Sequence, residues 1–472
     1  LMALAANGLF AAVPSGSDAK RLAPWAKGEF QIHFIHTGAG ESQFLIFPDG
    51  TTTVTMKLAT SFLSAEQAAH SLELEIGSKD FDGVFAAAQG EWDDLCGKFE
   101  IEGATYTELV TFYSCLYRMY AYPNLMSENE GTNASPVWVY ASPYKSGRKT
   151  AGILYTNNGF WDTYRTTWAG YSLFTADKDG EMLDGIVQHY IDSGWIPRWI
   201  CPGAANVMVG TSSDIIFADA MVKGIDFNYR KAWEAMTRDA SAYSANLTSG
   251  GRKNNNLSPY LGYVANDVGE GYSCTMANWL DDYGLYRMAT KLGLADEAEY
   301  YYNRCMKYPM LFNEAVGFFM GKSASGVFSG NASSYDPAAW GGPKGDYTES
   351  VGWVNTFPAV YDGEGLAALY GGREALAAKL DELFDDSIES MMKVVTGVGH
   401  EICEFKEVKM GQYEHNNQPS HHVIYTYAFS SKPYKVQQYT REVLSHVYAG
   451  SEIGQGYPGD EDNGEMSAWY IF

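Results

Sequence analysis

Acidic residues stand at two places in the sequence where their neighbours suggest chemistry. Residues 346–353 read Asp-Tyr-Thr-Glu-Ser-Val-Gly-Trp, which places Glu349 among hydroxyl and aromatic side chains. A carboxyl group in an aromatic, partly dry site has a raised pKa and can stay protonated near neutral pH, as a general acid must. The same residues also fit a glutamate at a helix start on a solvated face, and the sequence leaves both interpretations open.

The second acidic place is residues 456–469, where Asp460, Glu461 and Asp462 follow one another between glycines and before a tryptophan. An EF-hand loop starting at residue 460 would need Asp or Asn at 464 and Glu at 471, and the sequence has Gly and Ile there. A solvated acidic loop remains the alternative. The flanking glycines and tryptophan favour a functional site.

Aromatic residues make up 15% of the chain, which provides for a core and also for flat faces on which sugar rings stack. Residues 159–168 are the densest case, with Trp161, Asp162 and Arg165 where a helix is expected to begin. Asp162 could cap that helix and Arg165 could pair with an acid. Alternatively, Trp161 stacks on a sugar and Asp162 accepts hydrogen bonds from two of its hydroxyls.

Four of the nine histidines fall within residues 400–422, together with Asn417 and Gln418. Zinc is disfavoured because adjacent histidines rarely bind one ion and no His-Glu-x-x-His motif occurs. Asparagine, glutamine and backbone oxygens suit a hard cation such as Ca²⁺ better. For a metal bound by this segment, the residues therefore favour a hard cation such as Ca²⁺ over zinc.

Hydrophobic periodicity predicts strands first and helices afterwards. Alternating residues predict antiparallel strands at 30–35, 43–47 and 52–58. From about residue 78 the apolar spacing becomes helical, and the helices come in pairs joined by long loops without a fixed-length repeat. The predicted helices cover about residues 84–95, 109–119, 162–174, 181–193, 213–223, 229–243, 275–292, 295–307, 364–384 and 434–448. Paired helices in this number suit a ring of helical hairpins.

Composition excludes several classes of protein. A net charge of −24 argues against nucleic-acid binding and against a polybasic membrane contact. No apolar run is long enough to predict insertion into a membrane, and six cysteines are too few for a disulfide framework, although one or two bridges stay possible. The apolar stretch 467–472 at the end and the missing leader at the start lead us to expect part of a longer protein.

Read together, four segments resemble glycoside hydrolase family 92, the calcium-dependent exo-α-mannosidases. They are Gly-Phe-Trp-Asp-Thr-Tyr-Arg at 159–165, Tyr-Thr-Glu at 347–349, Asn-Gln-Pro-Ser-His-His at 417–422, and Gly-Asp-Glu-Asp-Asn-Gly-Glu-Met-Ser-Ala-Trp-Tyr at 459–470. The resemblance implies a mainly α fold, an (α/α)6 barrel over residues 76–472, preceded in residues 1–75 by the end of an antiparallel β-sandwich. It also implies a periplasmic, secreted or cell-surface bacterial protein and a mannose-containing glycan as substrate.

The same resemblance assigns the catalytic roles. Glu349 matches the general acid, and Asp460 and Asp462 match the acids that provide the general base, for which we favour Asp462. Because the family inverts configuration, acid and base should lie about 6.5–9.5 Å apart.

Residues that bind substrate and metal are assigned in the same way. Trp161, Asp162 and Arg165 match the part of the site that holds the terminal mannose, and the His-His segment adds His421. His400 and Glu401 resemble a pair that contacts the leaving sugar in members cleaving α-1,2 bonds, although both could be loop residues behind the site. Asn417 and Gln418 fall in the calcium region, where many relatives have Asn-Glu-Pro.

Two other classes of function fit parts of the sequence. A different helical-barrel carbohydrate enzyme, such as a lyase, would share the fold, but a lyase acting on an acidic polymer would usually need a basic cleft. A non-catalytic glycan-binding module would keep the aromatic residues but would have no use for Glu349 with Asp460 and Asp462.

Overall fold

The computed structural model describes residues 31–36, 41–46, 54–246, 250–385, 400–448 and 456–472. It divides into two compact units. The smaller contains residues up to Asp93 together with Glu128–Val137, and the larger contains Asp94–Ser127 and Trp138–Phe472. Residue 30, the first of the strand predicted at 30–35, and residues 47–53 lie outside the described part. Where the sandwich and barrel domains meet, near residue 75, stays a prediction.

In the smaller unit, strands β1 (Gln31–His36) and β2 (Glu41–Ile46) pair antiparallel, with Gln31 opposite Ile46. Helix α1 (Ala65–Glu75) begins where the Ser64 side chain accepts a hydrogen bond from the backbone of Gln67. Strand β4 (Glu128–Asn129) belongs to the same unit.

The third predicted strand, at 52–58, is wrong for the residues that the structure describes. Residues 54–58 have no regular structure. Val54, Met56 and Leu58 are about half exposed, so no neighbouring strand or helix covers the apolar side of this alternating segment. Without such a partner the pattern has no sheet to join.

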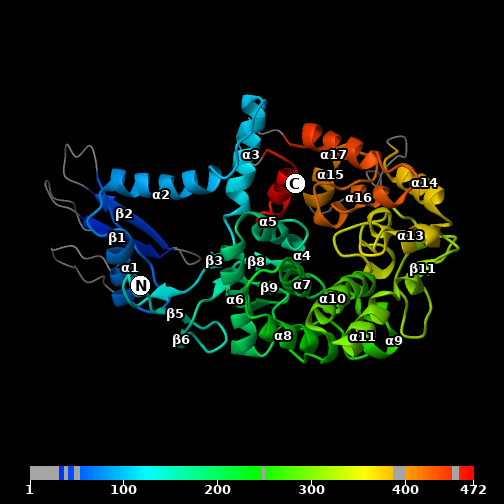
Figure 1. Cartoon of the computed structure of the whole chain (residues 1–472), viewed down its shortest axis with the longest axis horizontal. Helices are drawn as coiled ribbons and strands as arrows, with labels where there is room; N and C mark the ends of the chain where they lie inside the picture. The colour runs from blue at the N-terminus through cyan, green and yellow to red at the C-terminus, as the bar shows by residue number, and fades with distance from the viewer. Residues whose placement is uncertain (1–30, 37–40, 47–53, 247–249, 386–399, 449–455) are drawn as a thin grey trace. The chain divides into compact units, whose positions relative to one another are not determined.

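Helices are the predominant regular structure of the larger unit (Figure 1). Helix α2 (Phe81–Cys96) crosses the boundary between the units. The others are α3 (Tyr106–Met119), α4 (Phe160–Thr163), α5 (Thr167–Phe174), α6 (Ala176–Ser193), α7 (Ser213–Lys223), α8 (Tyr229–Ser241), α9 (Ser258–Leu261), α10 (Gly271–Leu292), α11 (Ala295–Cys305), α12 (Gly352–Asn355), α13 (Gly363–Tyr370), α14 (Arg373–Leu383), α15 (His400–Val408), α16 (Val423–Thr426), α17 (Lys435–His446) and α18 (Glu465–Ile471).

Each predicted helix corresponds to an observed one, with two exceptions. The predicted helix 364–384 is broken into α13 and α14 at Gly371 and Gly372, whose φ angles of +101° and +117° cannot belong to a right-handed helix. The predicted helix 162–174 is split into α4 and α5 by residues 164–166. In both cases the apolar spacing continues across a break in the backbone.

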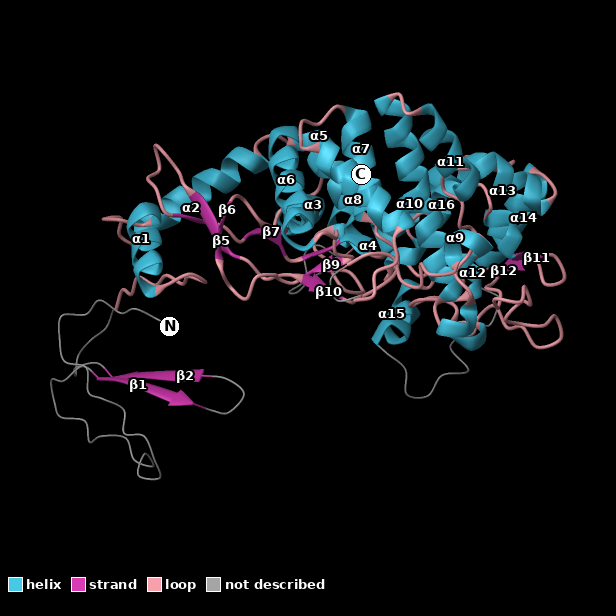
Figure 2. Cartoon of the chain, turned by 90° about the horizontal axis from the view of Figure 1, so that it is seen from below, coloured by secondary structure: helices cyan, strands magenta, loops and turns pink. Residues whose placement is uncertain are grey.

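Short strands connect the helices of this unit. They are β3 (Asn124–Leu125), β5 (Trp138–Ala141), β6 (Lys149–Ala151), β7 (Tyr155–Thr156), β8 (Asn158–Gly159), β9 (Trp199–Ile200), β10 (Ala204–Ala205), β11 (Phe312–Asn313) and β12 (Phe318–Phe319). Strands β8, β9 and β10 form one antiparallel sheet. Figure 2 shows this sheet, helices α4 and α15 and many of the connecting loops along one edge of the unit, with the long helices α6, α7 and α10 on the other side.

The helices of the larger unit return to their starting point. Helix α10 packs against α7 and α11, and α18 at the end of the chain packs against α3 and α5 (Figure 1). This closure brings residues after 456 next to residues near 160, although about 300 positions separate them.

A buried ionic cluster holds the middle of the ring. Arg252, which is fully buried, contacts Asp214 of α7 at 3.3 Å and Asp282 of α10 at 2.7 Å. Arg304 of α11 contacts the other oxygen of Asp282 at 2.9 Å. Buried acids are stable as anions only when they are paired in this way. The six cysteines are all free, so this cluster, rather than a disulfide, connects the elements.

Candidate active site

The loop that precedes α18 presents Asp462. Asp462 and Asn463 have φ angles of +54° and +55°, a backbone conformation that Asp and Asn adopt more readily than most residues. The Asn463 side chain accepts a hydrogen bond of 2.9 Å from the backbone nitrogen of Gly159. The acidic loop is therefore held against the start of α4, which carries Trp161 and Asp162.

The same loop lies against the segment that contains Asn417 and Gln418. A Cβ atom on Gly459 would lie 2.1 Å from the backbone oxygen of Asn416, so this close approach requires glycine. The side-chain amide of Gln418 donates a hydrogen bond to Oδ2 of Asp462. The two segments singled out in the sequence thus meet.

Glu349 reaches the same place from a third segment. Its backbone, with φ of +45°, is strained for a glutamate, and the Asn417 side chain donates a 2.8 Å hydrogen bond to its carbonyl oxygen. The residue is half-buried. Burial, followed by the charge of Glu401, raises the pKa of Glu349, as a proton donor requires.

The pKa of Asp462 is raised to about 8, chiefly by burial and then by the charges of Glu465 and Asp460. Asp162 is buried on α4, and its pKa lies well above the ordinary value because of burial and then because of Asp462. Glu349 also contributes to both shifts. The structure therefore brings Glu349, Asp162 and Asp462 together electrostatically.

Asp460 lies further out than Asp462. Its side chain is 67% exposed, and its Oδ2 is 3.7 Å from Nε2 of His400, the first residue of α15. Nε2 of the same histidine is 3.6 Å from Glu401, and its Nδ1 is 3.3 Å from Glu404. The hydrogen bond with Glu404 is the main cause that raises the pKa of His400. Asp460 and His400 thus form an exposed pair, with the half-buried Glu401 next to them, beside the buried acids.

Trp161 is 6% exposed. The guanidinium group of Arg165 lies over its ring at 5.2 Å and over that of Tyr164 at 4.7 Å. Trp161 and Arg165 line a cavity of about 90 Å³ together with Thr348. Because Arg165 covers the face of the Trp161 ring, a sugar could contact little more than the edge of that ring.

His421 is buried and both of its ring nitrogens are occupied. Nδ1 lies 2.7 Å from Oε1 of Glu465, and Nε2 lies 2.9 Å from the backbone oxygen of His415. Neither nitrogen is left to bind a sugar hydroxyl, and the geometry fits a residue that holds Glu465 in place.

Two acids of the acidic segment were not selected from the sequence. Glu465, at the first turn of α18, is fully buried and its Oε2 has no partner. Burial raises the pKa of Glu461 to about 7. Both belong to the Gly-Asp-Glu-Asp-Asn-Gly-Glu segment, but nothing in the residue order separates buried from exposed acids there.

The oxygen atoms that are available as metal ligands in this site suit a hard cation. Asp162 Oδ2, Asn416 Oδ1 and Glu465 Oε2 are buried without a hydrogen-bond partner. Among the described residues no three of His, Cys, Asp and Glu are grouped to hold a metal ion by themselves, so amide and backbone oxygens would have to complete a ligand set. An all-oxygen set suits Ca²⁺ rather than zinc. Asn417 and Gln418 supply such amide groups at the centre of the site.

A ring of helices with a cluster of carboxyl groups on the loops at one edge is the architecture of a carbohydrate-active enzyme domain. The sequence matches the family model described as the glycosyl hydrolase family 92 catalytic domain over residues 67–472. The chain belongs to glycosyl hydrolase family 92.

Solved structures of this family resemble the chain closely. A family GH92 inverting mannosidase from Bacteroides thetaiotaomicron superimposes with a TM-score of 0.77 at 34% identity, covering 94% of this chain and 61% of that one. A family GH92 α-mannosidase of the same organism, in complex with mannoimidazole, gives a TM-score of 0.73 at 25% identity over 87% of this chain and 52% of that one.

A curated relative, an uncharacterized secreted glycosidase from Arthroderma benhamiae, is 23% identical over 479 residues, which is 94% of this chain and 53% of that protein. The chain thus spans between about half and three-fifths of these relatives. The predicted (α/α) barrel is confirmed by the family structures. Among the described residues, no helix combines the length and the apolar character needed to cross a bilayer.

The raised pKa of Asp462 predicts how stability depends on pH. An acid whose pKa is about 8 in the folded chain and about 4 when unfolded destabilises the fold increasingly as pH rises between these values. In a metal-free buffer, Asp462→Asn should therefore raise the free energy of unfolding by about 2–5 kcal/mol at pH 8 and by almost nothing near pH 4.

Urea unfolding of the whole chain at several pH values measures this difference. Asp460→Asn, at an exposed position in the same loop, is the matched control and should change stability by less than about 0.5 kcal/mol. A difference between Asp462→Asn and the parent that does not grow with pH would contradict the raised pKa.

Proposed function

We propose that this chain is the catalytic part of an inverting exo-α-mannosidase that removes terminal α-mannose from mannose-rich glycans. The observation that carries the proposal is the meeting of Glu349 and Asp462, each held by a neighbouring amide side chain, with raised pKa values for both carboxyls. The similarity to a mannosidase described as inverting supports the same conclusion.

Glu349 acts as the general acid. Burial and the charge of Glu401 raise its pKa and so favour the protonated carboxyl group, whose proton passes to the glycosidic oxygen as the bond of that oxygen to the anomeric carbon breaks. A water oxygen forms the new bond from the opposite face, and Asp462 takes the proton of that water. The product has inverted configuration, and we expect the two carboxyl groups about 6.5–9.5 Å apart to leave room for the water.

Asp462 must be ionised to act as the base. Nearby acids oppose its ionised form, whereas a bound cation would favour it. Asp460 is the alternative base, but its exposed position makes it the weaker candidate.

Calcium is the proposed cofactor, with Asn417 and Gln418 in its binding region. When bound, it supplies a positive charge that grips two adjacent sugar hydroxyls and favours a distorted ring. In this chain, the Gln418 amide nitrogen is turned to Asp462, which leaves the amide oxygen as the atom for a metal.

The remaining predicted residues divide between the two sides of the scissile bond. Asp162 and Arg165, with the edge of Trp161, hold the terminal mannose. His400 and Glu401, which lie beside Asp460, contact the leaving sugar and favour α-1,2 bonds. Secretion is part of the proposal, supported by a relative whose name describes a secreted glycosidase.

Replacing Glu349 by Gln tests the acid role. The amide cannot deliver a proton, so hydrolysis of an alkyl or disaccharide α-mannoside should fall about 10²–10⁴-fold. A dinitrophenyl α-mannoside, whose leaving group needs no proton, should lose much less. Steady-state rates on both substrates measure the difference, and Glu382→Gln, on the exposed face of α14, should leave both unchanged.

Equal losses on the two substrates would contradict the acid role of Glu349. Binding of mannosides to the unaltered chain without any turnover would instead indicate a glycan-binding module.

Removal of calcium tests the cofactor. Dialysis against EDTA should abolish mannose release because the ionised form of Asp462 and the grip on the sugar hydroxyls are lost together, and added Ca²⁺ should restore it. Mannose release is measured directly by a coupled assay. Full activity in the presence of EDTA would contradict the calcium proposal without affecting the role of Glu349.

A further inference from the structure

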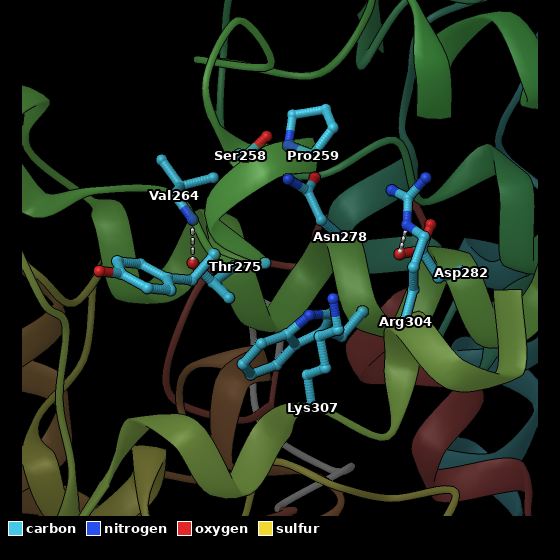
Figure 3. Close-up of a pocket in the computed structure, with 11 residues that line it drawn as sticks. Ser258, Pro259, Val264, Thr275, Asn278, Asp282, Arg304 and Lys307 are labelled. Carbon is cyan, nitrogen blue, oxygen red and sulfur yellow. Dashed lines mark hydrogen bonds and ion pairs between the residues drawn. The ribbon is translucent and has the colours of Figure 1, made fainter. Parts of the chain in front are cut away.

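A second cavity lies on the far side of α10 from the proposed active site. Thr275, Asn278, Trp279 and Asp282 of this helix line it (Figure 3). In contrast, Ser273, Met276, Ala277 and Leu280 of the same helix line the cavity that contains Trp161 and Arg165. The first cavity is completed by α9, by Arg304 of α11 and by Lys307 just after it.

Three polar groups face this cavity without a protein partner. Asn278 is 7% exposed and Trp279 is 3% exposed. Within the described part of the chain, no hydrogen bond is made by the Asn278 carboxamide, the Trp279 indole nitrogen or the Lys307 ammonium group. Buried polar groups in folded proteins are nearly always satisfied. Asn278 and Trp279 are such buried residues, and with the exposed Lys307 beside them they leave hydrogen-bond capacity at this cavity open to a polar ligand.

The other polar groups of the cavity are already satisfied. The Ser258 hydroxyl donates to Asn255 at 2.9 Å. The Thr275 hydroxyl donates to the backbone oxygen of Gly271 at 2.6 Å and accepts from the backbone nitrogen of Val264 at 2.9 Å. The groups that remain without a partner are thus mainly hydrogen-bond donors. They favour a ligand that only accepts hydrogen bonds over a sugar hydroxyl, which also needs to donate one.

The side chains that line the cavity carry a net positive charge, although the net charge of the whole chain is −24. The Asp282 carboxylate is bound by Arg252 on one oxygen and by Arg304 on the other, as the dashed line to Arg304 shows in Figure 3. Its negative charge is therefore compensated. Lys307 adds a charge for which no acid partner is found among the described residues.

Lys307 folds over the rim of the cavity. Its Cδ and Nζ atoms lie 3.2 and 3.4 Å from the place that a Cβ on Gly262 would take. Figure 3 shows the Asn278 carboxamide pointing toward Pro259 and the Lys307 side chain entering the cavity from the opposite side. The volume is about 30 Å³. This is room for roughly two water molecules, or for the two oxygens of one carboxylate.

We propose that this cavity binds the carboxylate group of an acidic ligand of the uronic-acid class. The carboxylate oxygens accept hydrogen bonds from the Lys307 ammonium, the Trp279 indole N–H and the Asn278 amide, and the rest of the ligand extends past the exposed Lys307 and Pro259. The inference is independent of the proposed catalytic function, because none of these residues belongs to the carboxyl cluster.

Calorimetric titration of the whole chain with sodium D-glucuronate tests the proposal, with D-glucose as the ligand control. Glucuronate should bind and glucose should not. Lys307→Met should weaken binding at least tenfold, and Trp279→Phe, which keeps an aromatic side chain but lacks the indole N–H donor, should weaken it several-fold. Lys291→Met, at an exposed lysine of α10, should bind as the parent does.

Several results would overturn the proposal. Equal binding of glucose and glucuronate would exclude carboxylate recognition, and unchanged binding by Lys307→Met would exclude this cavity. Tighter binding of inorganic phosphate than of glucuronate would show that the cavity recognises a tetrahedral anion rather than a carboxylate. Circular dichroism of each variant shows that it is folded, so loss of binding is not loss of structure.

Discussion

The constraint on which the rest of the site depends is the crowding of carboxyl groups around Asp462. Burial, followed by the charges of Glu465, Asp460, Glu461 and Glu349, raises the pKa of Asp462 to about 8, and the charge of Asp462 in turn helps to raise the pKa of Asp162. Such a cluster is stable only when some members keep a proton or when a cation compensates the charge. The same crowding that makes the fold less stable fits the proposed proton donor and the proposed calcium site.

Backbone geometry forces this crowding. Gly459 allows its loop to touch Asn416, and Asn463 fixes the same loop to Gly159. Asn417 and Gln418 then hold Glu349 and Asp462 by their side-chain amides. The Asn417 amide donates to the backbone carbonyl of Glu349, and the Gln418 amide donates to the Asp462 carboxylate. An amide does this without adding charge, whereas a lysine or arginine would neutralise the cluster. The closed ring of helices makes these contacts possible between segments far apart in the sequence.

Much of the fold could be predicted from the sequence because helical apolar spacing is a strong signal. The spacing located α7 and α11 closely, but it could not show that Gly371 and Gly372 break a helix whose apolar pattern continues. The alternating residues 54–58 failed as a strand because no neighbour covers them. Periodicity describes one element, whereas these differences depend on backbone conformation and on what packs against it.

The site was predicted less completely, for a similar reason. Residue types and the family resemblance pointed to Glu349 and Asp462, which the structure brings together. They could not distinguish the buried Glu465 from the exposed Asp460, since burial is decided by the closure of the ring. Neither could they show that His421 uses both nitrogens within the protein, or that Asn278 faces a cavity without a partner.

Proton release on calcium binding tests the central claim most directly. If Asp462 holds a proton at pH 7 because of its burial and the surrounding acids, a cation that binds beside it must displace that proton. Calorimetric titrations with Ca²⁺ in buffers of different ionisation enthalpy measure the protons released. The account predicts release of about one proton per ion at pH 7, decreasing above pH 8. Calcium binding without proton release, or no binding at millimolar calcium, would contradict it.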